Sequence, residues 1–119
     1  MSNSLYEQLG GEQGMSRIVH DFYDRVIADN EVNHFFKNSD MDRQKQHMSH
    51  FLGAAFGSGE DYDARLLTGA HAKLQAGHGH FDKVVEHLKD TLQEHRIPQQ
   101  ALNQAVDQIS GYRQHIVQH

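Results

Sequence analysis

Apolar residues recur along most of this chain at the spacing of an amphipathic α-helix. Between residues 15 and 27 they fall on one helical face, because neighbouring members are adjacent or lie three to four residues apart. The same spacing returns over residues 41–55, 67–74, 81–92 and 102–116. Val32, Phe35 and Phe36 form a short patch of one or two turns. No segment alternates as a half-buried strand does, so the pattern predicts an all-α fold with five helices.

Glycine and polar residues separate the predicted helices. These breaks lie at residues 10–11, 29–30, 57–63 and 77. Ser39 or Asp40 is expected to cap the helix that starts near residue 41. Pro98 lies where the last helix would begin, since its fixed φ suits a first turn.

The composition limits the size of the core. The chain has 119 residues, which fits one domain over residues 1–119. Only 37% of the residues are apolar, and the mean hydropathy is −0.74. Five amphipathic helices with so few apolar residues bury a thin core. Either the helices associate with another chain, or an apolar cofactor completes the core and stabilises the folded state.

Composition and charge exclude several classes of function. The chain has no cysteine, which excludes disulfides, iron–sulfur clusters and thiolate nucleophiles. Its net charge of −5 argues against a nucleic-acid partner held through phosphates. The sequence shows no membrane-spanning apolar run and no signal peptide. We therefore expect no membrane partner and a cytoplasmic location.

The most unusual feature of the composition is its 11 histidines. Most lie on polar faces or in loops and are expected to be solvated, namely His20, His34, His78, His80, His95 and His119. His71 differs because it shares an apolar face with Leu67 and Leu74. An imidazole on such a face is either a hydrogen-bonded core residue or a metal ligand.

Polar residues also interrupt the apolar stripe of the helix predicted over residues 41–55. Gln44 and His47 share a face with Phe51. Burying these groups unpaired would cost about 1–3 kcal/mol each, so a polar or metallic partner is expected. Tyr23, at the edge of the first helix's stripe, could place its hydroxyl in the same pocket or in water. His47 and His71 lie on different helices, so their imidazoles could ligate the iron of a flat cofactor from opposite sides.

Motifs along nearly the whole chain resemble those of group I truncated haemoglobins. The N-terminal ones are Leu5-Tyr6-Glu7-Gln8-Leu9-Gly10-Gly11, Asp21-Phe22-Tyr23-Asp24-Arg25-Val26 and His34-Phe35-Phe36. The later ones are the run from Asp40 through Gln44, His47 and Phe51-Leu52 to Phe56-Gly57, and Ala70-His71-Ala72-Lys73-Leu74 followed by His80-Phe81-Asp82. The resemblance implies a two-over-two helical sandwich around haem b, shorter than a full globin.

The resemblance also implies roles for particular residues. His71 matches the proximal ligand of the haem iron, and His47 matches a distal ligand that makes some members six-coordinate when no gas is bound. Tyr23 and Gln44 match distal residues that hydrogen-bond a bound gas. The residues expected to contact the haem plane or its rim are Phe36, Arg43, Lys45, Phe51, Tyr62, Leu67, Leu74 and Phe81.

The sequence departs from the family pattern at two places. Met48 stands where many members carry glutamine or leucine, which removes a possible second amide donor. Some members link a C-terminal histidine covalently to a haem vinyl group. The matching position here falls on Gln114, and His115 lies one residue, or about 100° of helix, further on. A covalent link at His115 is therefore left open.

Three functions are consistent with the sequence. The first is a monomeric protein that binds O₂, CO and NO reversibly at haem b. The second is an enzyme at the same site, a nitric oxide dioxygenase or a peroxidase-like protein that needs an external reductase. The third is a histidine-rich helical bundle that holds a non-haem metal, in which His47 and His50 could chelate. We favour haem-based gas binding, with NO detoxification as its use.

Overall fold

The computed structural model describes residues 4–36, 40–57 and 77–113. The elements in these ranges are α1 (Leu5–Gln8), α2 (Gly11–Ile27), the 3₁₀ turn η1 (Asn33–Phe36), α3 (Met41–Ala55), α5 (His78–Glu94) and α6 (Gln99–Ser110). All are helical, which confirms the all-α prediction for the part of the chain that is described. The periodicity does not predict α1, since four residues are too few to show a helical period. The helix predicted near residues 67–74 lies outside the described residues.

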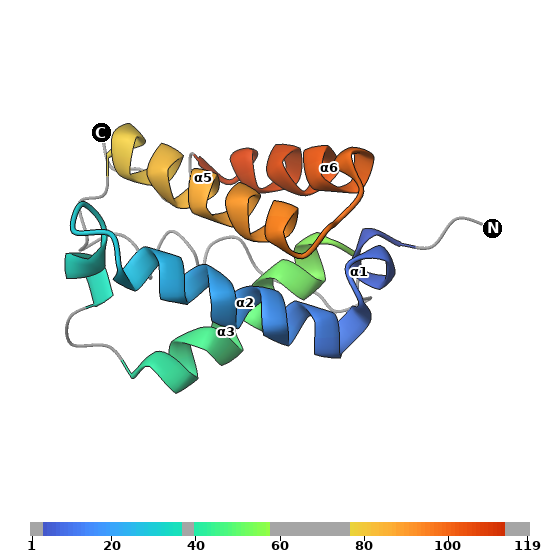
Figure 1. Ribbon diagram of the computed structural model, residues 1–119, viewed down its shortest axis with the longest axis horizontal. Helices are drawn as coiled ribbons and strands as arrows, with labels where there is room; N and C mark the ends of the chain where they lie inside the picture. The colour runs from blue at the N-terminus through green and yellow to red at the C-terminus, as the bar shows by residue number, and fades with distance from the viewer. Residues whose placement is uncertain (1–3, 37–39, 58–76, 114–119) are drawn as a thin grey trace.

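The long helices form two layers (Figure 1). In one layer α2 and α3 run antiparallel, and in the other α5 and α6 do. The two layers meet through α2, which packs against both α3 and α5. Among the described helices, none is long and apolar enough to cross a membrane. The largest fully buried side chains come from all four long helices, together with Val32 just before η1: Met15, Ile18, Val19, Phe22, Val26, Val32, Leu52, Leu88, Thr91, Leu92 and Leu102.

Local sequence sets where α2 and α3 begin. The Asp40 carboxylate accepts hydrogen bonds from the backbone N–H groups of Asp42 (3.1 Å) and Arg43 (3.3 Å), and so caps α3 as predicted. Gly10 precedes α2 with a φ of 103°, a left-handed conformation. A Cβ atom at Gly10 would lie 2.9 Å from the Cα atom of Gly14, so a larger residue would not fit there.

The last helix begins where predicted and ends earlier. Pro98 is the N-cap residue of α6. The predicted stripe continues to Tyr112 and Ile116, but α6 ends at Ser110 with Gly111 as its C-cap, so this part of the prediction is wrong. Serine and glycine favour a helix less than the preceding residues do, which explains the early end. Ile116 lies outside the described residues.

Ion pairs join α2 to α5 across the two layers. From one end of the contact to the other they are His95–Asp21, Arg25–Glu94 and His87–Asp29. In both histidine pairs Nε2 lies 2.7 Å from a carboxylate oxygen. The His95 side chain is only 22% exposed, so the prediction that it is solvated is wrong. The sequence could not reveal this, because the partner Asp21 is 74 residues away.

The remaining predicted solvent histidines divide into two groups. His20, His34 and His78 are exposed, as predicted. His80 is half-buried, and its Nδ1 accepts a hydrogen bond of 3.1 Å from the backbone N–H of Gly77. The first N–H groups of a helix have no partner within it, which is why the ring turns back to the start of α5. His119 lies outside the described residues.

Asp29 is the polar centre of one end of the α2–α5 contact. Its carboxylate accepts a hydrogen bond of 2.9 Å from the backbone N–H of Glu31 and lies 2.7 Å from Nε2 of His87. Nζ of Lys83 lies 3.8 Å away. The Glu31 bond foremost, then His87 and Lys83, hold the pKa of Asp29 below its usual value. The ionised carboxylate is therefore the form that the folded state favours.

We predict that Asp29→Asn destabilises the protein at pH 7 and that this loss shrinks in acid. A lowered carboxyl pKa stabilises the folded state above the unfolded pKa of about 3.9, and this stabilisation disappears as the pH falls through the folded pKa. Urea unfolding from about pH 7 down to pH 3 measures the effect. Asp107→Asn, at an exposed position of α6, is the control. A destabilisation by Asp29→Asn that is constant over this pH range would contradict the prediction.

Candidate functional site

A buried phenol and an amide meet between α2 and α3. Tyr23 of α2 is only 2% exposed, and its hydroxyl accepts a hydrogen bond of 3.1 Å from Nε2 of the half-buried Gln44 of α3. The rings of Phe22 and Phe36 pack edge-on against the Tyr23 ring, with centroids 5.0 and 5.5 Å away. The structure thus brings together three residues that the sequence analysis expected in one pocket: Tyr23, Gln44 and Phe36.

The environment keeps the Tyr23 hydroxyl protonated. Burial raises the pKa of Tyr23 to about 12, against the smaller opposing effect of its hydrogen bond with Gln44. A phenol oxygen can accept one hydrogen bond and still donate its own proton. The Tyr23 oxygen already accepts a hydrogen bond from the Gln44 amide. Its own proton is therefore available for donation to a third group near neutral pH.

The next residues of α3 continue the same face. His47 lies one turn beyond Gln44 and is exposed, Met48 is half-buried, and Phe51 is buried at 5% exposure. About two turns of α3 therefore offer an amide, an imidazole, a thioether and an aromatic ring along one side. An imidazole beside apolar side chains is suited to a metal ion held in an apolar organic group, because imidazole is a ligand that iron accepts.

The expected rim residues do not share one environment. Arg43 is exposed in the first turn of α3. Lys45 faces α2, where its Nζ donates a hydrogen bond of 3.1 Å to Nδ1 of His20. Phe81 is buried in the first turn of α5, under the guanidinium of Arg113 at 4.5 Å. The structure therefore does not bring Lys45 together with the Tyr23–Gln44 pair.

Other expected site residues lie outside the described part of the chain. They are Tyr62, Leu67, His71, Leu74 and His115. Their roles stay predictions of the sequence analysis, including the iron ligand at His71 and the haem link at His115.

A cleft of about 470 Å³ lies elsewhere, between α2 and α3 near α1. Its lining includes Glu12, His20, Lys45 and His50, and it does not include Tyr23 or Gln44. Most of its lining residues are polar, and they include groups of both charges, Glu12 and Lys45. The cleft is therefore a groove separate from the Tyr23–Gln44 pair.

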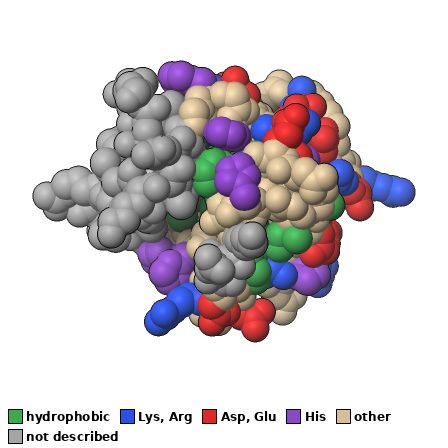
Figure 2. All heavy atoms as spheres, turned by 90° about the vertical axis from the view of Figure 1, so that its left-hand side faces the viewer, with side chains coloured by type: hydrophobic (Ala, Val, Ile, Leu, Met, Phe, Trp, Pro, Cys, Tyr) green, Lys and Arg blue, Asp and Glu red, His purple; other side chains and the backbone are tan. Residues whose placement is uncertain are grey.

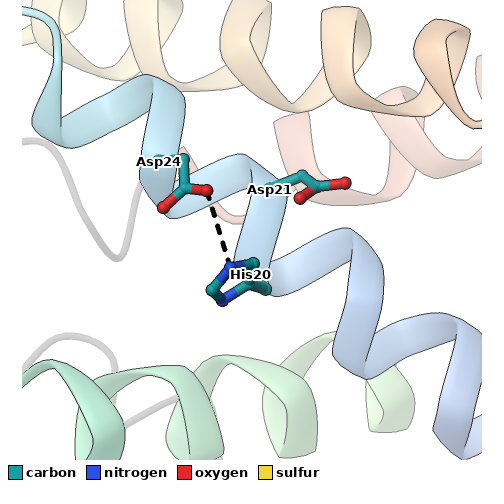
Figure 3. Close-up of side chains that lie close together, drawn as sticks. All are labelled: His20, Asp21 and Asp24. Atoms are coloured by element: carbon teal, nitrogen blue, oxygen red, sulfur yellow. Dashed lines mark ion pairs between the residues drawn. The ribbon is translucent and has the colours of Figure 1, made fainter.

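Three side chains next to this cleft have the composition of a metal site. His20, Asp21 and Asp24 project from one stretch of α2, and their potential ligand atoms lie within 4.8 Å of one another (Figure 3). Lys45 donates to Nδ1 of His20, which leaves the ring proton on Nε2, the nitrogen that lies 3.6 Å from Asp24. Asp21 is paired with His95. We therefore interpret these side chains as a polar network that joins α2 to its neighbours.

No other group of three or more potential ligands is found among the described residues. His47 and His50, the pair considered for a non-haem metal, are both exposed on α3 and belong to no such group there. Figure 2 shows histidines spread over one end of the molecule at separate places. The described histidines thus give no support to a metal site built from many of them.

Comparisons with known proteins identify relatives over most of the chain. The model of the family described as bacterial-like globin matches residues 4–118. The chain is 42% identical over 101 residues to a group 1 truncated haemoglobin of Synechocystis sp., which covers 82% of each chain. It is 38% identical over 110 residues to the group 1 truncated haemoglobin of Tetrahymena pyriformis, which covers 92% of this chain and 91% of the relative.

Solved structures give the same result. The truncated haemoglobin of Tetrahymena pyriformis in its Fe(III) form matches with a TM-score of 0.91 at 36% identity, over 98% of this chain and 100% of that one. The 2/2 haemoglobin of Synechococcus sp., solved in the cyanomet state with covalently attached haem, matches with a TM-score of 0.90 at 36% identity. That match covers 97% of this chain and 98% of the other. The two-over-two helical fold implied by the sequence motifs is therefore confirmed.

We predict that Tyr23 and Gln44 are energetically coupled. Unfolding of Tyr23→Phe, Gln44→Leu and the double variant should give a coupling free energy of about 0.5–1.5 kcal/mol, the usual net value of one hydrogen bond. Gln46→Leu, at an exposed position of α3, should show none with Tyr23→Phe. Additive effects of Tyr23→Phe and Gln44→Leu would show that the bond contributes nothing.

Proposed function

This chain belongs to the bacterial-like globin family as a group 1 truncated haemoglobin, a haem-binding globin, and from this premise we propose that it binds O₂, CO and NO at haem b. The observation that carries the proposal is the buried Tyr23 hydroxyl, held by Gln44 beside the imidazole-bearing face of α3. When bound, haem would supply an iron that a protein imidazole can hold and that can bind a diatomic gas. The residues of this chain determine which side chains ligate the iron and which side chains contact a bound gas.

The side chains on one face of α3 fit a haem group. Its predicted apolar stripe is only partly covered, because Met41, Met48 and Ala55 are half-buried, whereas Phe51 is buried. A planar apolar group with a metal at its centre would contact these side chains and accept a nitrogen ligand from His47. We assign the proximal ligand to His71 from its motif, with Leu67, Leu74 and Phe81 as apolar contacts and Phe36 and Phe51 against the plane. Arg43, Lys45 and Tyr62 stay rim candidates, of which Lys45 is engaged with His20.

Tyr23 has the properties of the direct donor to a bound gas. Its proton stays on the oxygen near neutral pH, and its oxygen is held by the Gln44 amide. A bound O₂ molecule draws partial negative charge, so a neutral donor aimed at it slows its release. In this arrangement Gln44 positions the phenol, and Tyr23 makes the contact.

His47 gives the site a competing ligand. It shares the α3 face with Gln44 and Phe51, and its side chain is exposed among the described residues. We assign His47 as the residue that would ligate the haem iron when no gas is present. A gas must then displace the imidazole, so the apparent affinity falls by the fraction of protein in the open form.

We also propose a reaction for the haem site. We propose NO detoxification, in which NO and O₂ combine to give nitrate while one electron is supplied by a separate reductase. We further propose that the protein is monomeric and cytoplasmic. Turnover of NO in the presence of a one-electron reductant distinguishes this enzyme from a reversible gas carrier. The absence of a Soret band from the purified protein would instead favour the non-haem alternative.

We predict that His47→Ala converts the ferric protein from a low-spin to a high-spin absorption spectrum. It should also speed CO binding to the ferrous protein by about tenfold or more, because closed states typically leave no more than about 10% of the protein open. Absorption spectra and stopped-flow mixing with CO measure both effects. His50→Ala, one turn along α3, is the matched control. A low-spin spectrum that survives His47→Ala would remove His47 as the ligand.

We predict that Tyr23→Phe accelerates O₂ release by roughly 10- to 100-fold. This range corresponds to the loss of a hydrogen bond to a partly charged acceptor, about 1.5–3 kcal/mol. CO carries less negative charge, so its release should change less. Stopped-flow displacement of each gas gives the two rates. Equal effects on O₂ and CO would show that Tyr23 acts through shape and not through its proton.

A further inference from the structure

Two residues beyond the end of α6 contact both layers of the fold. Tyr112 packs the edge of its ring against Phe51 of α3, with centroids 5.0 Å apart. Arg113 lies over the ring of Phe81 in the first turn of α5, with the guanidinium carbon 4.5 Å from the ring centroid. We call Tyr112–Arg113 the strap. Figure 1 shows why it can do this, because α6 runs back toward the start of α5.

Arg113 is held by three groups of one helical turn. Its Nη2 donates to the Asp82 carboxylate, its Nη1 lies 3.0 Å from Nδ1 of His78, and its plane covers Phe81. Residues 78, 81 and 82 lie on one side of α5, at the spacing of i, i+3 and i+4. A single exposed ion pair contributes little to stability. Here the planar fork of arginine meets a carboxylate, a ring nitrogen and an aromatic face together, and these fix its position.

The strap therefore braces two aromatic side chains that come from different layers. Phe51 and Phe81 are each buried at 5% exposure, and both are expected haem contacts. Phe51 belongs to the helix that carries Gln44 and His47. Phe81 lies in the first turn of α5, the helix that begins at His78. One short piece of chain thus contacts two expected haem contacts, one in each layer of the fold.

We propose that Tyr112 and Arg113 are positioning residues that slow the loss of haem by holding Phe51 and Phe81 in place. This inference rests on the proposed function. Neither side chain needs to touch the haem. They act through the two phenylalanines, so that removing the guanidinium loosens the first turn of α5 while the core of buried apolar residues stays intact.

The test is the rate at which the ferric holoprotein transfers its haem to excess apomyoglobin, followed in the Soret region. Arg113→Met should lose haem roughly tenfold faster, since it removes a charge-assisted bond and a cation–π contact at once. Arg113→Lys keeps the charge without the fork and should fall between Arg113→Met and the wild type. Asp82→Asn removes one partner only and should have a smaller effect. Arg17→Met, at an exposed position of α2, is the control and should lose haem at the wild-type rate.

A second readout separates positioning from general stability. In the ferrous His47→Ala protein, in which the proposal leaves one histidine on the iron, adding Arg113→Met should shift the iron–histidine stretching band seen by resonance Raman spectroscopy, and adding Arg17→Met should not. If the wild type holds haem and Arg113→Met releases it at the same rate as the wild type, the proposed role of the strap is wrong. The proposed function is unaffected by that result. Equal acceleration in Arg113→Met and Arg17→Met would also overturn the role of the strap. A wild-type protein without a Soret band would overturn both proposals.

Discussion

The hydrogen bond between Gln44 and Tyr23 is the constraint on which the site depends. A phenol at 2% exposure cannot be left unpaired without a cost of about 1–3 kcal/mol, and the amide from the neighbouring helix removes that cost. The bond also fixes how α3 is rotated about its axis against α2. With residue 44 turned toward Tyr23, the residues one and two turns later, His47 and Phe51, are turned to the same side.

The central position of α2 explains how so small a chain holds this arrangement. One face of α2 carries Tyr23 toward α3, and another carries Asp21 and Arg25 toward α5. Asp29, just after the end of α2, also pairs with α5. Two of the histidines supply much of the contact between α2 and α5. His87 and His95 pair with carboxylates of the other layer, and His80 completes the first turn of α5. The high histidine content thus serves the packing of helices more than the binding of several metal ions.

In our proposal one helix, α3, carries both a residue that supports gas binding and a residue that competes with it. The face of α3 carries the amide that positions the donor Tyr23 and the imidazole that competes with the gas. The strap adds a brace between this helix and the start of α5, through rings that the haem would also contact. Sequence reasoning did not single out Tyr112 and Arg113 as site residues, because Tyr112 belongs to the predicted apolar stripe over residues 102–116 and Arg113 has no apolar signal.

The sequence by itself determined the helices and the identity of the central residues. Apolar spacing reveals which face of a helix is buried, Asp40 and Pro98 mark two helix starts, and polar residues inside an apolar stripe drew attention to Gln44 and His47. Only the tertiary structure decided which residues meet. His87 and Asp29 are 58 residues apart, and Lys45 meets His20 across 25 residues. Periodicity fixes a face but not its partner, since the partner depends on how two helices are rotated and shifted against each other.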